Sequence, residues 1–153
     1  MEQYIGSKIV QAETMSWGEY NAAHGWPVSN NEAKSAEGYE VRYQDGYVSW
    51  SPKEVFEAAY RRTDGMNFGL ALEAAKKGMR IARKGWNGKN QYVELGTDFQ
   101  YTCAASDIPG SVGVQHTDIG SKALVFVGTR GSQVGWLASQ ADMLADDWMI
   151  VEG

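Results

Sequence analysis

A basic strip that ends in an indole contains the residue types most able to bind a ligand. Residues 66–89 contain six basic residues and one acid, a local charge of +5 in a chain whose net charge is −5. The basic residues are Lys76, Lys77, Arg80, Arg83, Lys84 and Lys89. Next to them, the indole of Trp86, the amide of Asn87 and the backbone N–H groups of a turn can hold a phosphorylated base. The simpler interpretation, a solvated helix end and strand face, is the more common origin of such a charge run.

A second group of candidate residues lies near the C-terminal end of the chain. Ser139 and Asp142 have the spacing of a capping box, in which the two side chains accept each other's backbone N–H groups. A cap of this kind can also present N–H groups to a phosphate, so both roles are compatible for Ser139, Gln140 and Asp142. Trp136 precedes the cap, and residue alternation leaves open whether its indole belongs to the core or stacks on a ligand.

The sequence offers no convincing catalytic or metal-binding set. Cys103 and His116 lie in one glycine-rich segment with Asp107 and Asp118, but a nucleophile needs a rigidly held base and an orienting third group. His24 is the only other histidine, and no Cys or His pair has the spacing of metal ligands. Phosphate-loop and dinucleotide fingerprints are absent from the sequence. We therefore expect a protein that is not an enzyme and has neither a cofactor nor a metal site.

The elements around the basic strip are predicted from capping and turn signals. Asn67 can cap a helix that ends at Gly78, where a left-handed residue closes it. Its predicted apolar face contains Phe68, Ala71, Leu72 and Ala75. Residues 79–83 then alternate as a strand, Asn87 and Gly88 form the strongest short hairpin signal, and residues 91–95 return.

The rest of the chain shows short strand and helix patterns. In the N-terminal part we expect a strand within residues 5–15, a helix from the Ser16 capping box to about His24, and a loop over residues 27–38. A hairpin over residues 39–50 turns at Asp45–Gly46, and a helix capped by Ser51 follows. The predicted buried face of that helix contains Val55, Phe56, Ala59 and Tyr60.

The C-terminal part contains a long glycine-rich segment, residues 96–121, which indicates function or mobility. Strands over 123–127, 133–137 and 146–151 follow, with a short helix from Ser139 through Ala145. The prediction is an α+β fold of short antiparallel strands and a few short helices. It is divided into two small modules, residues 1–63 and 66–153.

Composition limits the classes of protein and partner. The 153 residues are 43% hydrophobic and 22% charged, as in ordinary globular proteins. The acidic balance argues against binding long nucleic acid, and no apolar run is long enough to cross a membrane. One cysteine and no visible signal peptide favour a cytosolic protein.

Residues 3–62 resemble a small phage protein family of unknown function. The resemblance rests on residues 4–12, 38–41 and 46–56, and the Trp-Ser-Pro-Lys block at residues 50–53 is its most specific part. It implies a phage or prophage origin and says little about chemistry.

Residues 66–153 are similar to the second Thoeris anti-defence family. Three motifs occur in order, at residues 66–74, 83–89 and 136–148. The resemblance implies a phage protein in the cytoplasm of the infected bacterium that binds cyclic nucleotide immune signals without cleaving them. Such signals include the cyclic ADP-ribose isomers made by TIR enzymes, and for some members cyclic oligonucleotides. It also implies a homo-oligomer, usually a tetramer, with ligand between subunits.

On this hypothesis the ligand-binding residues stack on the ligand, form hydrogen bonds with it or supply positive charge. They are Trp86, Asn87, Trp136, Ser139, Gln140, Asp142, Arg80, Arg83 and Lys89. The indoles stack on bases, Asn87 bonds a base edge or ribose, Ser139 and Gln140 meet phosphate, and the basic residues supply charge. The alternative is an interaction module that blocks a host protein, in which case residues 1–63 are the active part.

Overall fold

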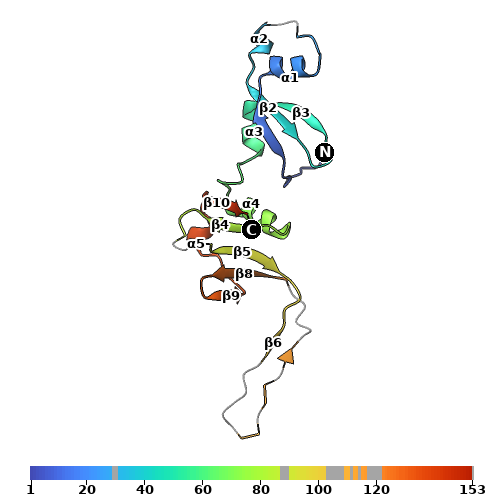
Figure 1. Cartoon of the computed structure of the whole chain (residues 1–153). Coiled ribbons are helices and arrows are strands. Elements are labelled where there is room, and N and C mark those ends of the chain that lie inside the picture. Colours follow the sequence, from blue (N-terminus) through green and yellow to red (C-terminus); the bar gives the residue numbers. More distant parts are fainter. Residues whose placement is uncertain are drawn as a thin grey trace. The chain divides into compact units, whose positions relative to one another are not determined.

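The chain forms two compact units, Met1–Arg61 and Arg62–Gly153, each described here by itself. The computed structural model describes residues 1–28, 31–86, 90–102, 109–110, 112–113, 115–116 and 122–152, with only the backbone of 31–32, 101–102 and 115–116. Two antiparallel sheets with short helices confirm the predicted α+β class (Figure 1). None of the helices in this described part has the length and apolar character that a bilayer crossing requires.

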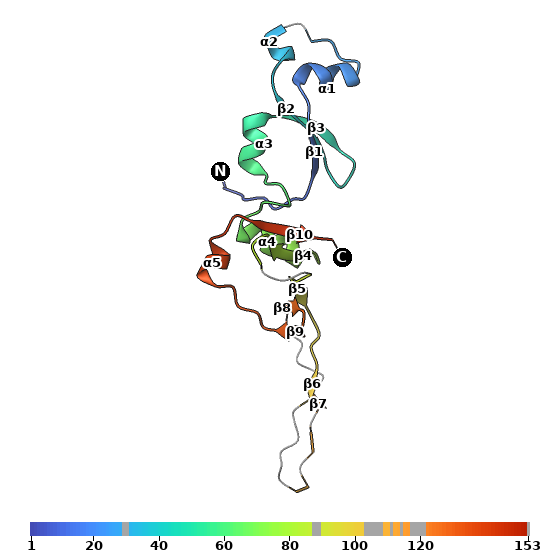
Figure 2. The same cartoon turned by 60° about the vertical axis from the view of Figure 1, so that its left-hand side comes forward.

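Unit 1 is a three-stranded sheet with a helix alongside it (Figure 2). Its elements are β1 (Gln11–Thr14), α1 (Trp17–Ala23), α2 (Asn31–Lys34), β2 (Gly38–Arg42), β3 (Val48–Pro52) and α3 (Lys53–Ala59). The strand order is β1-β2-β3. Tyr39 stacks on Phe56 of α3, with 4.4 Å between ring centroids, whereas Trp50 contacts Trp17 of α1 at 5.0 Å. Because Tyr39 and Trp50 point to opposite faces, α3 covers one face of the sheet and α1 part of the other.

Three predictions for unit 1 are wrong, those for a loop, for a helix cap and for the buried face of a helix. The predicted loop over residues 27–38 contains α2, a single short turn of helix. Ser51 does not cap α3, because it continues the ladder opposite Tyr39 and the strand runs on through Pro52, which has no side-chain cap bond. Val55 is 61% exposed, and α3 has no fully buried residue. A narrow sheet gives this helix contact along one line only, and that line passes through Phe56.

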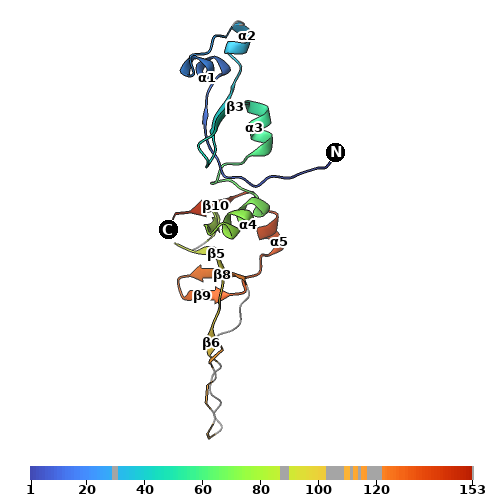
Figure 3. The ribbon, with the colours of Figure 1, turned by 90° about the vertical axis from the view of Figure 1, so that its right-hand side faces the viewer.

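Unit 2 is a five-stranded sheet with α4 packed on one face (Figure 3). Its elements are α4 (Phe68–Lys76), β4 (Arg80–Arg83), β5 (Tyr92–Gly96), β6 (Tyr101–Thr102), β7 (Gln115–His116), β8 (Ala123–Gly128), β9 (Gly131–Val134), α5 (Gln140–Met143) and β10 (Trp148–Val151). The strand order is β10-β4-β5-β8-β9, and β6 pairs with β7 separately, within the segment predicted as a long loop. The buried core contains Met66, Ala71, Ala74, Ala75, Ile81, Val93 and Trp148.

Local signals in unit 2 predict the helix start correctly and two element ends incorrectly. The Asn67 side chain accepts from the Leu70 N–H at 2.9 Å, and Gly78 has a φ of 89°, as the capping pattern predicts. The strand predicted over 133–137 ends at Val134, because Gly135 has a φ of 87° that strand geometry does not allow. The helix α5 ends at Met143 instead of Ala145. The predicted hairpin turn at residues 87–88 lies outside the described residues.

Candidate functional site

Three tryptophans from distant parts of unit 2 form one cluster. Trp86 follows β4, Trp136 follows β9 and Trp148 begins β10. Their ring centroids lie 5.5 to 6.2 Å apart, and the rings meet edge to face at 70° to 76°. This geometry is favourable for aromatic pairs and stabilises the cluster. We call Trp86, Trp136 and Trp148 the tryptophan cluster.

Burial divides the cluster into one structural and two accessible members. Trp148 is fully buried, and its indole N–H donates to the Asp142 carbonyl at 2.8 Å, so its role is structural. Trp86 and Trp136 are half-buried, and Phe126 packs against Trp86 at 5.6 Å. Each of these two indoles therefore combines a packed side with a solvent-accessible side. The two interpretations that the sequence left open for Trp136, core packing and ligand contact, are compatible.

Backbone bonds determine where the two accessible indoles lie. The N–H groups of Gly135 and Trp136 both donate to the Leu124 carbonyl at 2.9 Å, so the residues after β9 turn back onto β8. The Trp86 N–H donates to the Arg83 carbonyl at 3.3 Å in the turn after β4. Both indoles are thus attached to sheet strands through short connections, which limits their freedom to move.

The short helix α5 begins beside the tryptophan cluster with the predicted capping box. The Asp142 N–H donates to Ser139 Oγ at 3.1 Å, and Asp142 Oδ2 accepts from the Ser139 N–H at 3.0 Å and from its hydroxyl at 2.8 Å. Both side chains are engaged with each other, while Gln140, the first residue of α5, is exposed. Ser139 and Asp142 therefore hold the shape of the helix start, and Gln140 faces solvent there.

Arg83 is held by two carboxylates. Its Nε donates to Asp147 Oδ1 at 2.8 Å, and its Nη1 donates to Asp142 Oδ1 at 3.0 Å. All three side chains are at most about one-third exposed. This clamp, defined by Arg83, Asp142 and Asp147, ties α5 to β4 and to the start of β10.

The clamp shifts the proton affinity of its members. The hydrogen bond from Arg83 lowers the pKa of Asp147, and the bonds to Asp147 and then Asp142 raise the pKa of Arg83. Burial alone acts to raise the pKa of Asp142, but hydrogen bonds from Ser139 and Arg83 outweigh it and leave the pKa lowered. Both carboxylates are therefore charged at neutral pH, and they neutralise Arg83.

Arg80 lies apart from the tryptophan cluster. Alternation along β4 places it on the opposite face of the sheet from Arg83, where its Nε is 3.5 Å from Glu94 and its guanidinium lies over the Tyr92 ring at 4.6 Å. The basic strip is thus divided between two faces. Asn87 and Lys89, the other predicted ligand contacts, lie outside the described residues.

Sequence reasoning missed Asp147 and Phe126. Asp147 adjoins Trp148 in the third motif, but its ion-pair partner Arg83 is 64 residues away, so no local sequence pattern predicts the pair. Of the residues considered for a catalytic set, Cys103, Asp107 and Asp118 lie outside the described residues, as does the side chain of His116. Within the described ranges no three or more His, Cys, Asp or Glu residues gather as a metal ligand set.

Comparison with known proteins places unit 2 in a family. Residues 66–151 match the Thoeris anti-defense 2-like domain. The chain is also similar to Thoeris anti-defense 2 of Bacillus phage SP01, at 38% identity over 87 residues, which are 56% of this chain and 94% of that protein. The matched region contains the tryptophan cluster, the clamp and α5. The resemblance predicted from the three motifs is confirmed, and the chain belongs to the Thoeris anti-defense 2-like family.

Proposed function

We propose that the protein binds a cyclic nucleotide immune signal in the cytoplasm of the infected bacterium and sequesters it without cleaving it. The observation that carries this proposal is membership of the Thoeris anti-defense 2-like family over residues 66–151. The expected signals are cyclic ADP-ribose isomers made by TIR enzymes, and cyclic oligonucleotides are a second class to test. No cofactor is required, because the proposed action is binding alone.

The accessible members of the tryptophan cluster supply the stacking surfaces. Stacking of a base on an aromatic side chain contributes about 1–3 kcal/mol per base. Trp86 and Trp136 are already held edge to face at 6.0 Å, so little side-chain freedom is lost when a ligand binds. A base that stacks on either indole lies close to the other and to the start of α5.

Polar contacts come from the start of α5 and from the basic residues. Gln140 is exposed and free to meet a phosphate or ribose, and Ser139 and Asp142 shape the backbone beside it. In this proposal Arg83 acts through the clamp by holding α5 in place. Asn87 and Lys89 contact the base or phosphate. Arg80 supplies charge from a neighbouring subunit, because its own face of the sheet is turned away from Trp86 and Trp136.

Exposed apolar side chains near α5 support an oligomer, which we propose to be a homotetramer with the signal between subunits. Leu137 is 89% exposed, Leu144 78%, Val134 59% and Met143 40%. These four residues lie within eleven positions of one another, from the last residue of β9 to the residue that follows α5. Apolar groups gathered in this way commonly mark an interface between proteins. A second subunit covering them lies next to the proposed signal site.

Sequestration requires tight binding. The protein must outcompete the host effector for the signal, so nanomolar affinity is needed, roughly −12 kcal/mol. A stacked base and several charge-assisted hydrogen bonds to the phosphates in a closed site are of the right order.

The test mixes a cyclic ADP-ribose signal with excess protein, measures the loss of free signal, and then denatures the protein by heat. We expect unaltered signal to be recovered and to activate the effector again. Recovery of a linear or cleaved product contradicts sequestration and makes the protein an enzyme. A Trp136→Phe variant keeps a ring in the cluster and is expected to bind more weakly, because the smaller ring offers less stacking surface.

A further inference from the structure

Unit 1 has an open strand edge. β1 lies at the end of the order β1-β2-β3, and all four of its residues are exposed. The Met15 N–H donates to the Gly38 carbonyl, and Glu13 pairs with Glu40 in the same register, so Ala12 and Thr14 direct their N–H and C=O groups away from β2. Within the described residues, no other backbone group bonds to these outward groups. Such an edge is a template for another extended chain.

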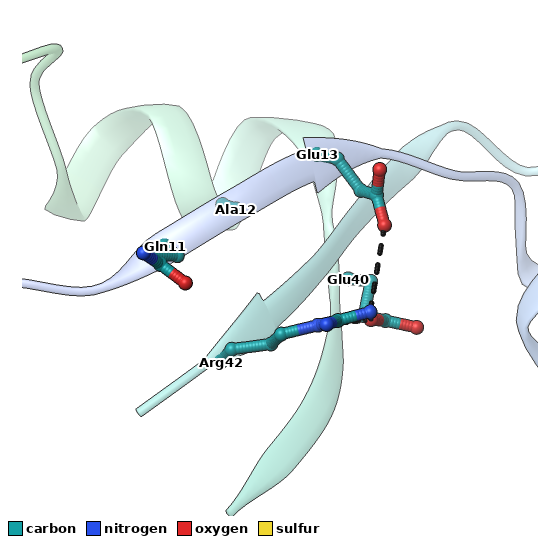
Figure 4. Close-up of a pocket in the computed structure, with 5 residues that line it drawn as sticks. All are labelled: Gln11, Ala12, Glu13, Glu40 and Arg42. Carbon is teal, nitrogen blue, oxygen red and sulfur yellow. Dashed lines mark hydrogen bonds and ion pairs between the residues drawn. The ribbon is translucent and has the colours of Figure 1, made fainter. Parts of the chain in front are cut away.

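A polar pocket lies beside this edge, on the face of the sheet that α3 does not cover (Figure 4). Its volume is about 230 Å³, and its lining residues are Gln11, Ala12, Glu13, Glu40 and Arg42. Gln11 is directly opposite Arg42 and Glu13 is directly opposite Glu40, so these four side chains share one face.

The charges in the pocket are unbalanced. Two carboxylates placed directly opposite each other repel, and only one guanidinium lies between them. Arg42 Nη2 is 2.7 Å from Glu40 Oε1 but 3.8 Å from Glu13 Oε1. The Glu40 side chain is 7% exposed and that of Glu13 is 63% exposed. Arg42 therefore pairs mainly with Glu40, and Glu13 remains able to pair with a second cation.

The whole of unit 1 has the same sign of charge as the pocket. Residues 1–61 contain nine acids and five basic residues. A net negative surface repels nucleic acid and anionic membranes and attracts basic partners. Among macromolecular ligands, the charge thus favours a basic protein segment.

We propose that β1 binds an extended basic segment of a partner protein, which pairs with the open edge and places a Lys or Arg side chain against Glu13. Ala12 and Thr14 supply the main-chain hydrogen bonds. The partner residue opposite Glu13 points to the same face as the pocket, with its Cβ about 4.5–5.5 Å from that of Glu13. Since side chains alternate along a strand, basic residues at every second position of the segment face the pocket. This site is independent of the proposed signal site.

The test measures binding of fluorescent peptides to the full-length protein by anisotropy. The probe is a short peptide of alternating Lys and Thr. One control peptide has Glu in place of Lys, and a second has the Lys sequence with N-methylated backbone positions that cannot pair with a strand. We expect the Lys–Thr peptide to bind, more weakly as salt is added. Neither control peptide should bind.

Two pairs of protein variants test the two parts of the proposal. Glu13→Lys reverses the charge at the pocket, and Glu54→Lys makes the same change at an exposed position of α3. Ala12→Pro removes one outward N–H without touching the β1–β2 ladder, and Ala12→Ser retains it. We expect Glu13→Lys and Ala12→Pro each to weaken peptide binding about tenfold or more, and the two matched controls to bind as the natural protein does.

Several outcomes overturn the proposal. One is no binding of the Lys–Thr peptide, and another is equal binding by Glu13→Lys and Glu54→Lys. A lower mass of Ala12→Pro in light scattering means that the edge pairs with a second copy of this chain. Circular dichroism checks that each variant is folded. Ala12→Pro and Glu13→Lys test different contacts, so if one variant misfolds, the other still tests the proposal.

Discussion

The role that the sequence predicts for Arg83 differs from the role that the structure gives it. In the sequence it belongs to a basic strip that could bind an anion. In the structure its donors are shared between Asp142 and Asp147, which come from the far end of the chain. At the residue scale, the clamp therefore positions α5, and in the proposed function the accessible indoles of Trp86 and Trp136 are the surfaces that contact the ligand.

Removal of the clamp cation should destabilise unit 2. Arg83→Ala leaves two partly buried carboxylates without their shared partner, which should cost about 2 kcal/mol of unfolding free energy. Arg80→Ala is the matched control, because the Arg80 side chain is 41% exposed with a 3.5 Å contact to Glu94, and the substitution should change stability by less than about 0.5 kcal/mol. Urea titration with unchanged m-values measures both. Equal effects of the two substitutions would contradict the clamp.

The clamp also predicts a direction for the acid dependence of stability. Asp147 has a lowered pKa in the folded state, chiefly through its hydrogen bond from Arg83, so the unfolded chain binds its proton first as the pH falls. This contribution to stability is fully present above the ordinary carboxyl pKa of about 4 and disappears as the pH falls through the lower folded value. Urea unfolding between neutral pH and about pH 3 should therefore show a steeper loss for the natural protein than for Asp147→Asn. If the unfolding free energies of the two proteins fall in parallel with pH, groups other than Asp147 cause the loss of stability in acid.

At the element scale, two capping boxes make a natural comparison. Ser16 caps α1 in unit 1 and Ser139 caps α5 in unit 2, with the same reciprocal bonds to Glu19 and Asp142. The two helices differ in what surrounds them. α5 adjoins the tryptophan cluster and is held by the clamp, whereas α1 packs on Trp50 in a unit that carries none of the proposed signal contacts.

The two caps should therefore affect stability alike and signal binding differently. Ser16→Ala and Ser139→Ala are each expected to cost about 1 kcal/mol, the usual contribution of an N-cap. Only Ser139→Ala should weaken signal binding, because it loosens the backbone that carries Gln140. Isothermal titration with a cyclic ADP-ribose signal and thermal unfolding measure the two quantities. A loss of signal binding in Ser16→Ala would implicate unit 1 in the signal site.

At the scale of the whole molecule, the two units differ in net charge, in the number of strands in their sheets and in the partner proposed for each. Unit 2 contains the family match and the proposed signal site. Unit 1 contains the open edge of β1 and the pocket with Glu13. This division predicts that the two activities can be separated. The assignment of residues 1–63 and 66–153 as two functional modules remains a prediction.

Deletion of residues 1–63 should leave signal binding intact and abolish binding of the basic peptide. Titration with signal and peptide measures both, and circular dichroism checks that the remaining chain is folded. Loss of signal binding in a folded fragment would contradict the assignment of the signal site to unit 2 and favour an interaction module as the main function.

The proposed oligomer should depend on the exposed apolar residues beside α5. Leu137→Ser together with Leu144→Ser should lower the mass measured by light scattering and weaken signal binding, because both side chains are more than three-quarters exposed in one chain. Val55→Ser, which changes an exposed apolar residue of α3, is the control and should leave the mass unchanged. A natural protein that is monomeric at micromolar concentration would contradict the proposal.

The sequence by itself determined the features that depend on a few neighbouring residues. The caps at Ser16, Asn67 and Ser139, the left-handed Gly78 and the two strands predicted after it are all present, because each depends on contacts within about four residues. These signals were enough to predict the α+β class. They failed at Ser51, where pairing with a neighbouring strand outweighed the local capping pattern.

Only the tertiary structure decided what the candidate site contains. It joined Arg83 to carboxylates 59 and 64 residues away, assembled the tryptophan cluster from three distant parts of the chain, and separated Arg80 from Arg83 onto opposite faces. The physical reason is that sheet order and register determine which distant side chains meet, since a one-residue change of register turns every side chain of a strand to the other face. The spacing of residues within one stretch does not specify which distant strand becomes its neighbour. The charge of a stretch can be counted from sequence, but which of its charges are already neutralised depends on the fold.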